Sequence, residues 1–205
     1  MNNVQEWLQG AYDEKTKEEI KRLQDENPEA LTDAFYTSLK FGTAGMRGLM
    51  GVGTNRMNTY TVRAASQGLA NYLKKQPFSK AQISILIGYD SRHHSKEFAL
   101  EAARIFAYNG IKAYLMKNLR PVPMVSFGTR FKHCQAGVMI TASHNPAAYN
   151  GYKVYWSDGG QVLPPHDVGI VAEVNKISHF DALKTAPADD PLIIPIEEEL
   201  DEAYL

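Results

Sequence analysis

The chain has 205 residues, of which 44% are hydrophobic and 22% charged, and its formal net charge at pH 7 is −1. This composition is that of an ordinary globular protein, and the balanced charge provides no general attraction to nucleic acid or to an anionic membrane. The single cysteine, Cys134, excludes an intramolecular disulfide and a cysteine-rich zinc site. Because the N-terminus lacks a signal peptide and no apolar run approaches about 20 residues, we expect a cytoplasmic protein.

Residues 1–40 predict a helical arm that lies on the rest of the chain. Asp13 is suited to cap a charged helix from Glu14 to Glu26. Pro28 suits the first turn of a second helix. The alternating charges of this arm indicate a face turned toward solvent.

From Phe41 the pattern changes to strands that alternate with helices. Residues 41–48 form a glycine-rich segment that predicts a loop, with a short strand beside it at 49–52. This order of elements predicts an α/β fold of three layers, with helices on both faces of a mostly parallel mixed sheet. The expected helices are 59–75, capped by Asn58; 95–109, capped by Ser95; 121–131; and 164–177. The expected strands are 83–87, 112–116 and 135–140, followed by a hairpin of 152–156 with 161–163.

The C-terminal part of the sequence predicts less regular structure. Residues 179–195 are rich in Pro, Asp and Ala, which favours an irregular connector. The segment from Pro195 to Leu205 begins like a helix and has no C-cap. We therefore divide the chain into the arm (1–40), an α/β domain (41–195) and the start of a helix that leads to a second domain (196–205).

The sequence Thr-Ala-Ser-His-Asn-Pro at 141–146 follows a buried strand, at the end where open α/β sheets bind ligands. The alternative is a plain turn. A serine hydrolase needs a base and an orienting acid near Ser143, and the Gly-x-Ser-x-Gly elbow of α/β-hydrolases is not present. A serine that carries a phosphoryl group needs backbone N–H groups and cations instead, and Lys153 is close enough in sequence to supply one.

Two further segments carry candidate chemistry. The glycines of 41–48 would allow close approach of an oxyanion, and Arg47 offers a bidentate partner for phosphate, but the segment matches no nucleotide-binding motif. Residues 88–94 (Gly-Tyr-Asp-Ser-Arg-His-His) end the strand at 83–87. There we favour a structural ion pair of Asp90 with Arg92 that shapes the site, and a direct role in substrate binding is the alternative. We do not expect a metal site, because adjacent histidines rarely converge on one ion.

These three motifs together resemble the α-D-phosphohexomutase superfamily, and within it the branch of phosphoglucomutases and phosphopentomutases. Residues 141–146 are similar to that family's phosphoserine loop, and 41–48 are similar to its N-terminal signature. Asn-Gly-Tyr-Lys at 150–153 matches the stretch that follows the catalytic loop. The resemblance extends over about 41–178, and the long helical arm is similar to that of the same branch.

The resemblance implies that Ser143 carries a phosphoryl group exchanged with a sugar, and that this phosphate ligates Mg²⁺. Arg47 and Lys153 would surround the phosphoserine and help with charge and proton transfer, and His144 would lie close to it. Contacts to phosphate or substrate would come from Thr43, Gly45, Arg47, Asn145 and Lys153. The reaction would interconvert glucose 1-phosphate and glucose 6-phosphate through a hexose 1,6-bisphosphate.

Other functions stay open at this point. A phosphopentomutase or a hexose-bisphosphate synthase could use the same scaffold, and so could a non-catalytic phosphate-binding module. The sequence contains no Asp-x-Asp and no Gly-Glu-x-Ser-Gly, from which the family takes its remaining metal ligands and its sugar contacts. We therefore expect downstream domains of the same polypeptide and a phosphosugar as partners, no nucleic acid or membrane, and no turnover by these 205 residues alone.

Overall fold

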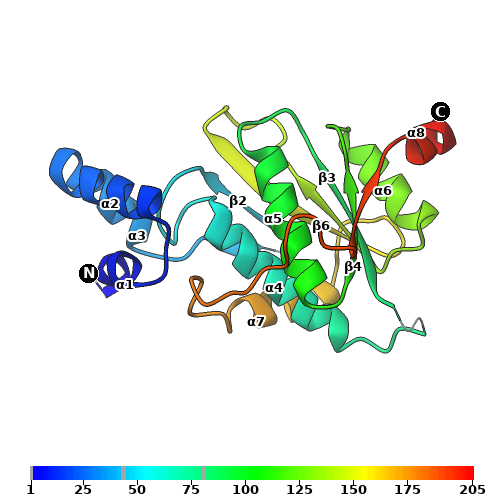
Figure 1. Cartoon of the computed structure of the whole chain (residues 1–205), viewed down its shortest axis with the longest axis horizontal. Coiled ribbons are helices and arrows are strands. Elements are labelled where there is room, and N and C mark those ends of the chain that lie inside the picture. The colour runs from blue at the N-terminus through cyan, green and yellow to red at the C-terminus, as the bar shows by residue number, and fades with distance from the viewer. Residues whose placement is uncertain (1, 43–44, 80–81) are drawn as a thin grey trace.

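A computed structural model describes residues 2–42, 45–79 and 82–205 of the chain (Figure 1). Within these residues, a mixed sheet has the strand order β1-β2-β6-β5-β3-β4-β7. Strands β5, β3, β4 and β7 are parallel to one another, whereas β1, β2, β6 and β5 pair antiparallel in that order. The strands are β1 (Phe41–Gly42), β2 (Gly45–Leu49), β3 (Ser84–Tyr89), β4 (Lys112–Met116), β5 (Ala136–Ile140), β6 (Tyr149–Trp156) and β7 (Ile193–Ile196).

Helices cover both faces of this sheet, which confirms the three-layer α/β fold. Helices α4, α5 and α7 pack on one face and α6 and α8 on the other. No helix in the described parts of the chain is long and apolar enough to cross a bilayer. The helices are α1 (Asn2–Gln9), α2 (Glu14–Glu26), α3 (Pro28–Phe35), α4 (Thr59–Lys74), α5 (Ser95–Tyr108), α6 (Val122–Phe131), α7 (His166–Val174) and α8 (Glu198–Tyr204).

The central strand β3 shows why both faces must be covered. Successive side chains of a strand point to opposite faces, and every residue of β3 is buried. Ile85 and Ile87 belong to the core under α4 and α5, and Leu86 belongs to the core under α6 and α8. A near-continuous apolar strand of this kind requires a helix layer on each side.

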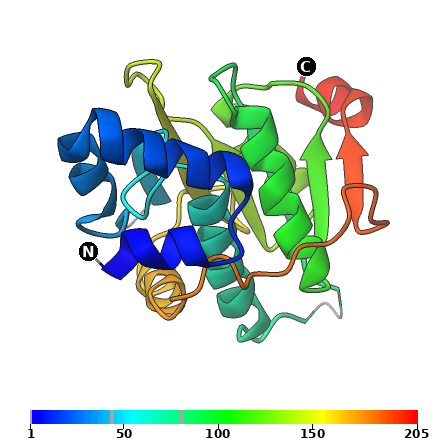
Figure 2. The same cartoon turned by 60° about the vertical axis from the view of Figure 1, so that its left-hand side comes forward.

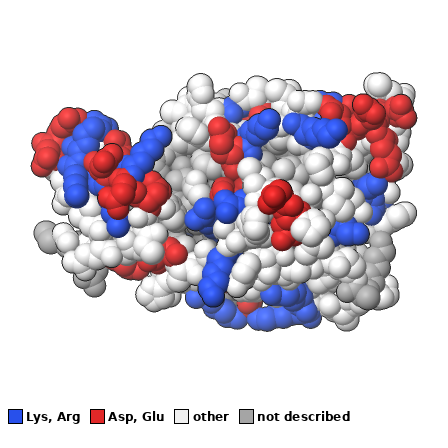
Figure 3. Space-filling view, viewed as in Figure 1, with Lys and Arg blue, Asp and Glu red and all other residues white. Residues whose placement is uncertain are grey.

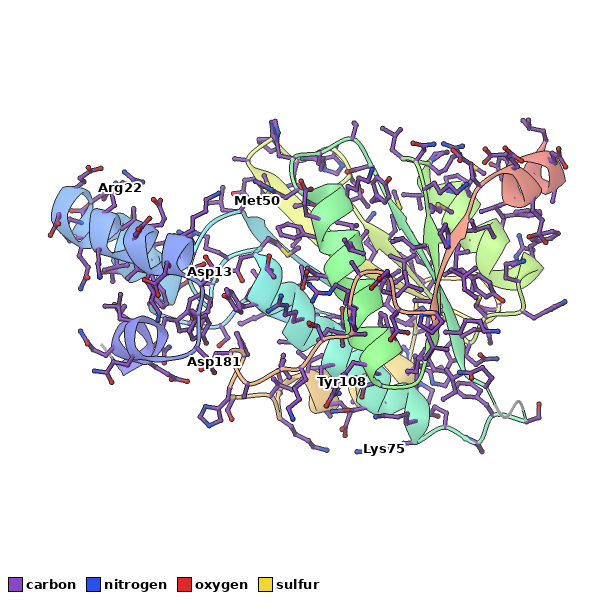
Figure 4. All side chains as sticks on the ribbon, in the orientation of Figure 1. Asp13, Arg22, Met50, Lys75, Tyr108 and Asp181 are labelled. Carbon is purple, nitrogen blue, oxygen red and sulfur yellow. The ribbon has the colours of Figure 1, made fainter. Side chains whose placement is uncertain are left out.

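The N-terminal arm, α1 to α3, lies at one side of the sheet domain (Figure 2). It packs through a small, largely aromatic cluster that it shares with Tyr60 of α4. Trp7 stacks on Tyr12 with ring centroids 4.2 Å apart, and both rings contact Tyr60 of α4. Asp13 caps α2, because its side chain accepts a hydrogen bond from Thr16 N at 2.9 Å. Figure 4 places Asp13 at the start of α2 and Asp181 beside the arm, where Asp181 accepts a hydrogen bond from the backbone of Ala11 at 3.0 Å. The arm is therefore attached to the sheet domain at several points, among them Tyr60, Asp181 and the ion pair of Asp33 with Arg56.

The structure corrects three predicted elements. The glycine-rich segment at 41–48 is not one loop, because Phe41–Gly42 and Gly45–Leu49 form the paired strands β1 and β2. The predicted hairpin of 152–156 with 161–163 is present only in part. Strand β6 pairs with β2 and β5, and residues 161–163 form no strand, but the chain turns back to an antiparallel bridge of Gln161 with Tyr155 and a hydrogen bond from Val162 N to Val154 O at 3.2 Å.

The helix expected from Pro195 is the third correction. Residues 193–196 instead form β7, which pairs with β4 and crosses the predicted boundary at 195/196, and α8 follows. Ser95 is also not a cap but the first residue of α5. The N-cap is His94 in a left-handed conformation.

Candidate active site

Ser143 lies on the loop between β5 and β6, and its side chain is exposed. Its φ is 54°, in the left-handed region that non-glycine residues seldom adopt. Thr141 supports this geometry, because its Oγ1 accepts a hydrogen bond from Ser143 N at 2.9 Å. The hydroxyl is therefore presented at the carboxyl end of a buried strand, as the sequence predicted.

Lys153 approaches Ser143 from the neighbouring antiparallel strand. It lies on β6 opposite Met139 of β5, and its Nζ donates a hydrogen bond to Ser143 Oγ at 2.7 Å. Partial burial lowers the pKa of Lys153, and the positive charge of Arg47 lowers it further, whereas Asp90 acts in the opposite direction. The amine beside the serine is thus easier to deprotonate than an ordinary lysine.

Arg47 comes from the other side of β6. It lies on β2 opposite Gly151, and its exposed Nη1 donates a hydrogen bond to Asn145 Oδ1 at 2.7 Å. Asn145 lies on the serine loop, so this bond joins β2 to the loop. Two cations, Arg47 and Lys153, are consequently held on either side of the serine loop by the pairing of three adjacent strands.

The predicted ion pair of Asp90 with Arg92 is present, with Arg92 Nε 3.5 Å from Asp90 Oδ2. Sequence reasoning missed that Arg92 also donates to backbone carbonyls of the serine loop. It also missed Asn150, which is fully buried and donates from Nδ2 to Ser95 Oγ at 2.9 Å and to His93 O at 3.0 Å. The sequence feature that could have pointed to Asn150 is its polar side chain near the start of a strand in which most other residues are apolar.

For two other predicted site residues, His144 and Gly45, the structure shows no hydrogen bond to Ser143 among the residues that it describes. The exposed side chain of His144 forms no hydrogen bond or ion pair with any residue that the structure describes. Gly45 lies in β2 opposite Lys153, where its φ of 131° and its packing against Tyr152 leave no room for a side chain. Thr43 lies outside the described residues.

A cleft of about 420 Å³ opens beside the serine. Its walls come from the β3–α5 loop, including Ser91 and His93, and from the serine loop, including Asn145. A larger groove of about 760 Å³ runs between α2 and the segment that precedes α4, where Figure 3 shows a hollow beside the lobe of mixed charge. That groove is not lined by Ser143, Arg47 or Lys153, so the larger volume does not identify the candidate active site.

Comparison with known proteins settles the family. The family model "Phosphoglucomutase/phosphomannomutase, alpha/beta/alpha domain I" matches residues 38–181. The chain belongs to this family. The match agrees with the resemblance inferred from the motifs between 41 and 178, and it includes the serine loop and the strands that carry Arg47 and Lys153.

Three relatives of this phosphoglucomutase/phosphomannomutase domain illustrate the match. A probable phosphoribomutase of Schizosaccharomyces pombe is 45% identical over 174 residues, which are 84% of this chain and 30% of that protein. A phosphoglucomutase of Staphylococcus epidermidis is 42% identical over 183 residues, which are 88% of this chain and 33% of that protein. The crystal structure of a putative phosphomannomutase from Thermus thermophilus superposes with a TM-score of 0.67 and 27% identity, covering 82% of this chain and 35% of that one. The chain thus spans about a third of each of these proteins.

The magnesium ion implied by the family resemblance does not fit the residues of this chain alone. Mg²⁺ requires several oxygen ligands in an octahedron. Among the residues described here, no group of three or more His, Cys, Asp and Glu could hold a metal. Asp90 is the carboxylate that lines the serine cleft, and its oxygens are already bonded to Arg92 and Ser95.

Proposed function

We propose that this chain is the serine-bearing domain of a phosphomutase, which moves a phosphoryl group between two positions of a sugar phosphate by way of Ser143. The observation that carries the proposal is the 2.7 Å contact of Lys153 Nζ with the exposed Ser143 Oγ, at the mouth of a cleft. A serine activated by an adjacent base is the usual arrangement of an oxygen nucleophile. The family to which the chain belongs supports the mutase class.

The first half of the proposed reaction phosphorylates the serine. Oγ of Ser143 attacks one phosphorus of a sugar bisphosphate, so that the Oγ–P bond forms while the bond from that phosphorus to the sugar oxygen breaks, and a sugar monophosphate remains. The hydroxyl proton passes to the neutral amine of Lys153, and the departing sugar oxygen takes a proton from water. In the other half, the free hydroxyl of a sugar monophosphate attacks the phosphoserine, so that the sugar bisphosphate forms as the Oγ–P bond breaks. The attacking hydroxyl loses its proton to water, and Lys153 returns a proton to Oγ.

The surroundings of the serine suit this transfer because phosphoryl transfer depends mainly on positioning and on stabilisation of negative charge. Arg47 and Lys153 would supply two positive charges, with Asn145 orienting Arg47. We expect Mg²⁺ to add a further positive charge in the whole enzyme, with its remaining ligands from domains that follow this one. His144, Thr43 and Gly45 stay predictions as contacts of the substrate.

For the substrate we propose glucose 1-phosphate and glucose 6-phosphate, with a hexose 1,6-bisphosphate between them. Pentose phosphates are the second candidate, and they are supported by the relative named as a probable phosphoribomutase, which is 45% identical over the matched region. A hexose-bisphosphate synthase would use the same phosphoserine step. Each of these substrates fits the cytoplasmic location that we expect from the sequence.

The proposal is tested by intact-mass spectrometry of the 205-residue chain after incubation with glucose 1,6-bisphosphate or ribose 1,5-bisphosphate, with and without Mg²⁺. We expect the mass of one phosphoryl group, mapped by peptide fragmentation to Ser143 and absent from Ser143→Ala. Comparison of the two donors ranks hexose against pentose. Phosphate on another residue, equal labelling of Ser143→Ala, or no labelling by either donor would contradict the proposal. Reaction of Ser143 with a fluorophosphonate probe would instead favour a serine hydrolase.

A further inference from the structure

Arg92 lies on the loop between β3 and α5, and its side chain is only 14% exposed. Its guanidinium faces the serine loop and reaches four backbone carbonyls there. Nη2 donates to Ser143 O at 2.7 Å and to Asn145 O at 2.5 Å. Nη1 donates to Pro146 O at 2.9 Å and to Tyr149 O at 3.0 Å.

These bonds use all four N–H groups of the two Nη atoms. A guanidinium has five N–H groups in a rigid plane, four of them on the two Nη atoms. All four have a carbonyl acceptor, and Nε faces Asp90 Oδ2 at 3.5 Å. Although Arg92 lines the serine cleft, its two Nη atoms therefore have no N–H group left for a phosphate, and their hydrogen bonds go to backbone carbonyls from Ser143 to Tyr149.

The serine loop is also bonded to its neighbours by Met50 N, which donates to Ala148 O at 2.9 Å, and by Arg47 Nη1, which donates to Asn145 Oδ1 at 2.7 Å, but neither bond acts on the backbone of Ser143. Within the loop, Asn145 N donates to Ala142 O at 3.1 Å and Tyr149 N to Pro146 O at 3.0 Å. Ser143 also has the left-handed φ of 54°, a conformation that persists only where its surroundings enforce it. Arg92 bonds the carbonyl of Ser143 directly, so it acts on the residue that most needs such support.

The backbone of Arg92 is anchored as well as its guanidinium. Asp90 Oδ1 accepts hydrogen bonds from Arg92 N at 3.0 Å and from Ser95 Oγ at 2.8 Å. Ser95 Oγ in turn accepts a bond from the buried Asn150 at the start of β6. The arginine is thus fixed to β3, to α5 and to β6, and these elements form the frame against which the loop is held.

We propose that Arg92 is a positioning residue that fixes the serine loop, so that Ser143 Oγ stays within hydrogen-bond distance of Lys153 Nζ. It acts through the backbone of the loop and touches neither the phosphoryl group nor the sugar. Of the measurements below, only the second rests on the proposed function. The positioning role of Arg92 and the phosphomutase function can therefore be contradicted separately.

The first measurement is amide hydrogen exchange in Arg92→Lys, followed on peptides that cover 141–150. A lysine ammonium has three donors on one atom and cannot span four carbonyls. We expect exchange at Ser143, Asn145 and Tyr149 to rise by about tenfold or more, with β3 and β5 unchanged. The matched control is Arg104→Lys, which alters an arginine of α5 that bonds Ala186 O, Thr185 and Glu101 away from the cleft. Unchanged exchange in the loop, or a rise spread evenly over the sheet, would overturn the proposal.

The second measurement is the rate at which a sugar bisphosphate phosphorylates Ser143. We expect Arg92→Lys to lower the maximal rate by about tenfold or more while the half-saturating donor concentration stays unchanged, because the loop and not the donor is affected. A higher half-saturating concentration at an unchanged maximal rate would mean that Arg92 binds the donor, and would overturn the proposal. Loss of labelling in the wild-type chain as well would count against the proposed function and leave the exchange result standing.

A third measurement needs no variant and covers the case in which Arg92→Lys fails to fold. In the wild-type chain, nitrogen-15 NMR should resolve separate Nη signals for Arg92, because bonds to four fixed carbonyls block rotation about the guanidinium. Arg130, which is exposed and whose side chain bonds none of the described residues, serves as the internal comparison. A single averaged Nη signal for Arg92, like that of a freely rotating arginine, would overturn the proposal.

Discussion

Ser143 and Lys153 are ten residues apart in the chain, and Ser143 Oγ lies 2.7 Å from Lys153 Nζ. They meet because the chain reverses between β5 and β6, which run antiparallel from the serine loop. The pairing of β6 with its neighbours fixes the position of Lys153, whereas the conformation of the serine loop fixes the position of Ser143. The pair therefore depends on two separate parts of the structure, which can be tested one at a time.

Replacing Lys153 tests the strand side of this pair. We expect Lys153→Met to slow phosphorylation of Ser143 by about 10²-fold, since the group that takes the hydroxyl proton is lost. Lys153→Arg should be similarly slow, because a guanidinium keeps the charge but cannot act as a base at neutral pH. Rates come from the time course of intact mass. The matched control is Lys132→Met, which removes a similarly half-buried lysine paired with Glu199 on α8, and should label at the wild-type rate.

The pH dependence of this step follows from the lowered pKa of Lys153. The amine accepts a proton only when neutral, so the labelling rate should rise as pH increases through that pKa, and the midpoint should lie below that of an ordinary lysine. Arg47 is one cause of the lowering. Arg47→Gln should therefore move the midpoint to higher pH, in addition to any loss of maximal rate. A midpoint that stays the same or moves to lower pH would show that Arg47 does not influence Lys153.

Gly45→Ala tests whether the close contact of β2 with β6 is needed for the fold. An added Cβ would overlap the carbonyl oxygen of Tyr152, and the φ of 131° is strained for any side chain. We expect a loss of about 3 kcal/mol or more in the free energy of unfolding, measured in urea. Gly110→Ala is the control, because its φ of 73° carries the strain but no atom lies within 4 Å of the added Cβ. Equal losses in the two variants would mean that the overlap is relieved by a small shift.

The attachment of the arm should be sensitive to acid. Tyr60 donates from its hydroxyl to Asp13 Oδ2 at 2.7 Å. Partial burial alone would raise the pKa of Asp13, but the hydrogen bonds from Tyr60 and Thr16 outweigh it and lower that pKa. A carboxylate whose pKa is lowered on folding stabilises the fold above its unfolded pKa, about 3.9, and this stability is lost as pH falls through the folded value.

Tyr60→Phe should therefore cost about 2 kcal/mol at neutral pH, and the difference from the wild type should shrink in acid. Denaturation in urea at several pH values measures both the loss of stability at neutral pH and its decrease in acid. Tyr114→Phe serves as the control, since the Tyr114 hydroxyl bonds none of the described residues. A difference between Tyr60→Phe and the wild type that persists unchanged in acid would contradict the role given to Asp13.

The helices were predictable because their signals are local. Asn58 caps α4 as expected, with its side chain accepting bonds from Tyr60 N and Thr61 N. Asp13 and Pro28 likewise mark helix starts in the sequence and in the structure. A capping residue acts on amides two or three positions away, so the sequence near it contains all the necessary information.

The strands near the site were less predictable because their partners are distant in sequence. Residues 45–48 contain two glycines and belong to the segment predicted as a loop, yet with Leu49 they form β2 because β6, about a hundred residues later, provides hydrogen bonds. Strand β7 was not predicted for the same reason, since its pairing with the distant β4 stabilises it and the local sequence of 193–196 does not identify it as a strand. The serine, its lysine and the second cation were found from motifs, whereas the four carbonyl contacts of Arg92 depend on how two loops meet.

The pairing of β6 with both neighbours has a consequence for how such a site can vary. Sliding β6 by a single residue would turn the lysine side chain to the opposite face of the sheet, away from the serine. Gly151 resists such a slide, because its Cα fits between the carbonyls of Thr141 and Met46 with no space for a methyl group. An odd-numbered insertion within β6 before the lysine would therefore separate the two reactive groups.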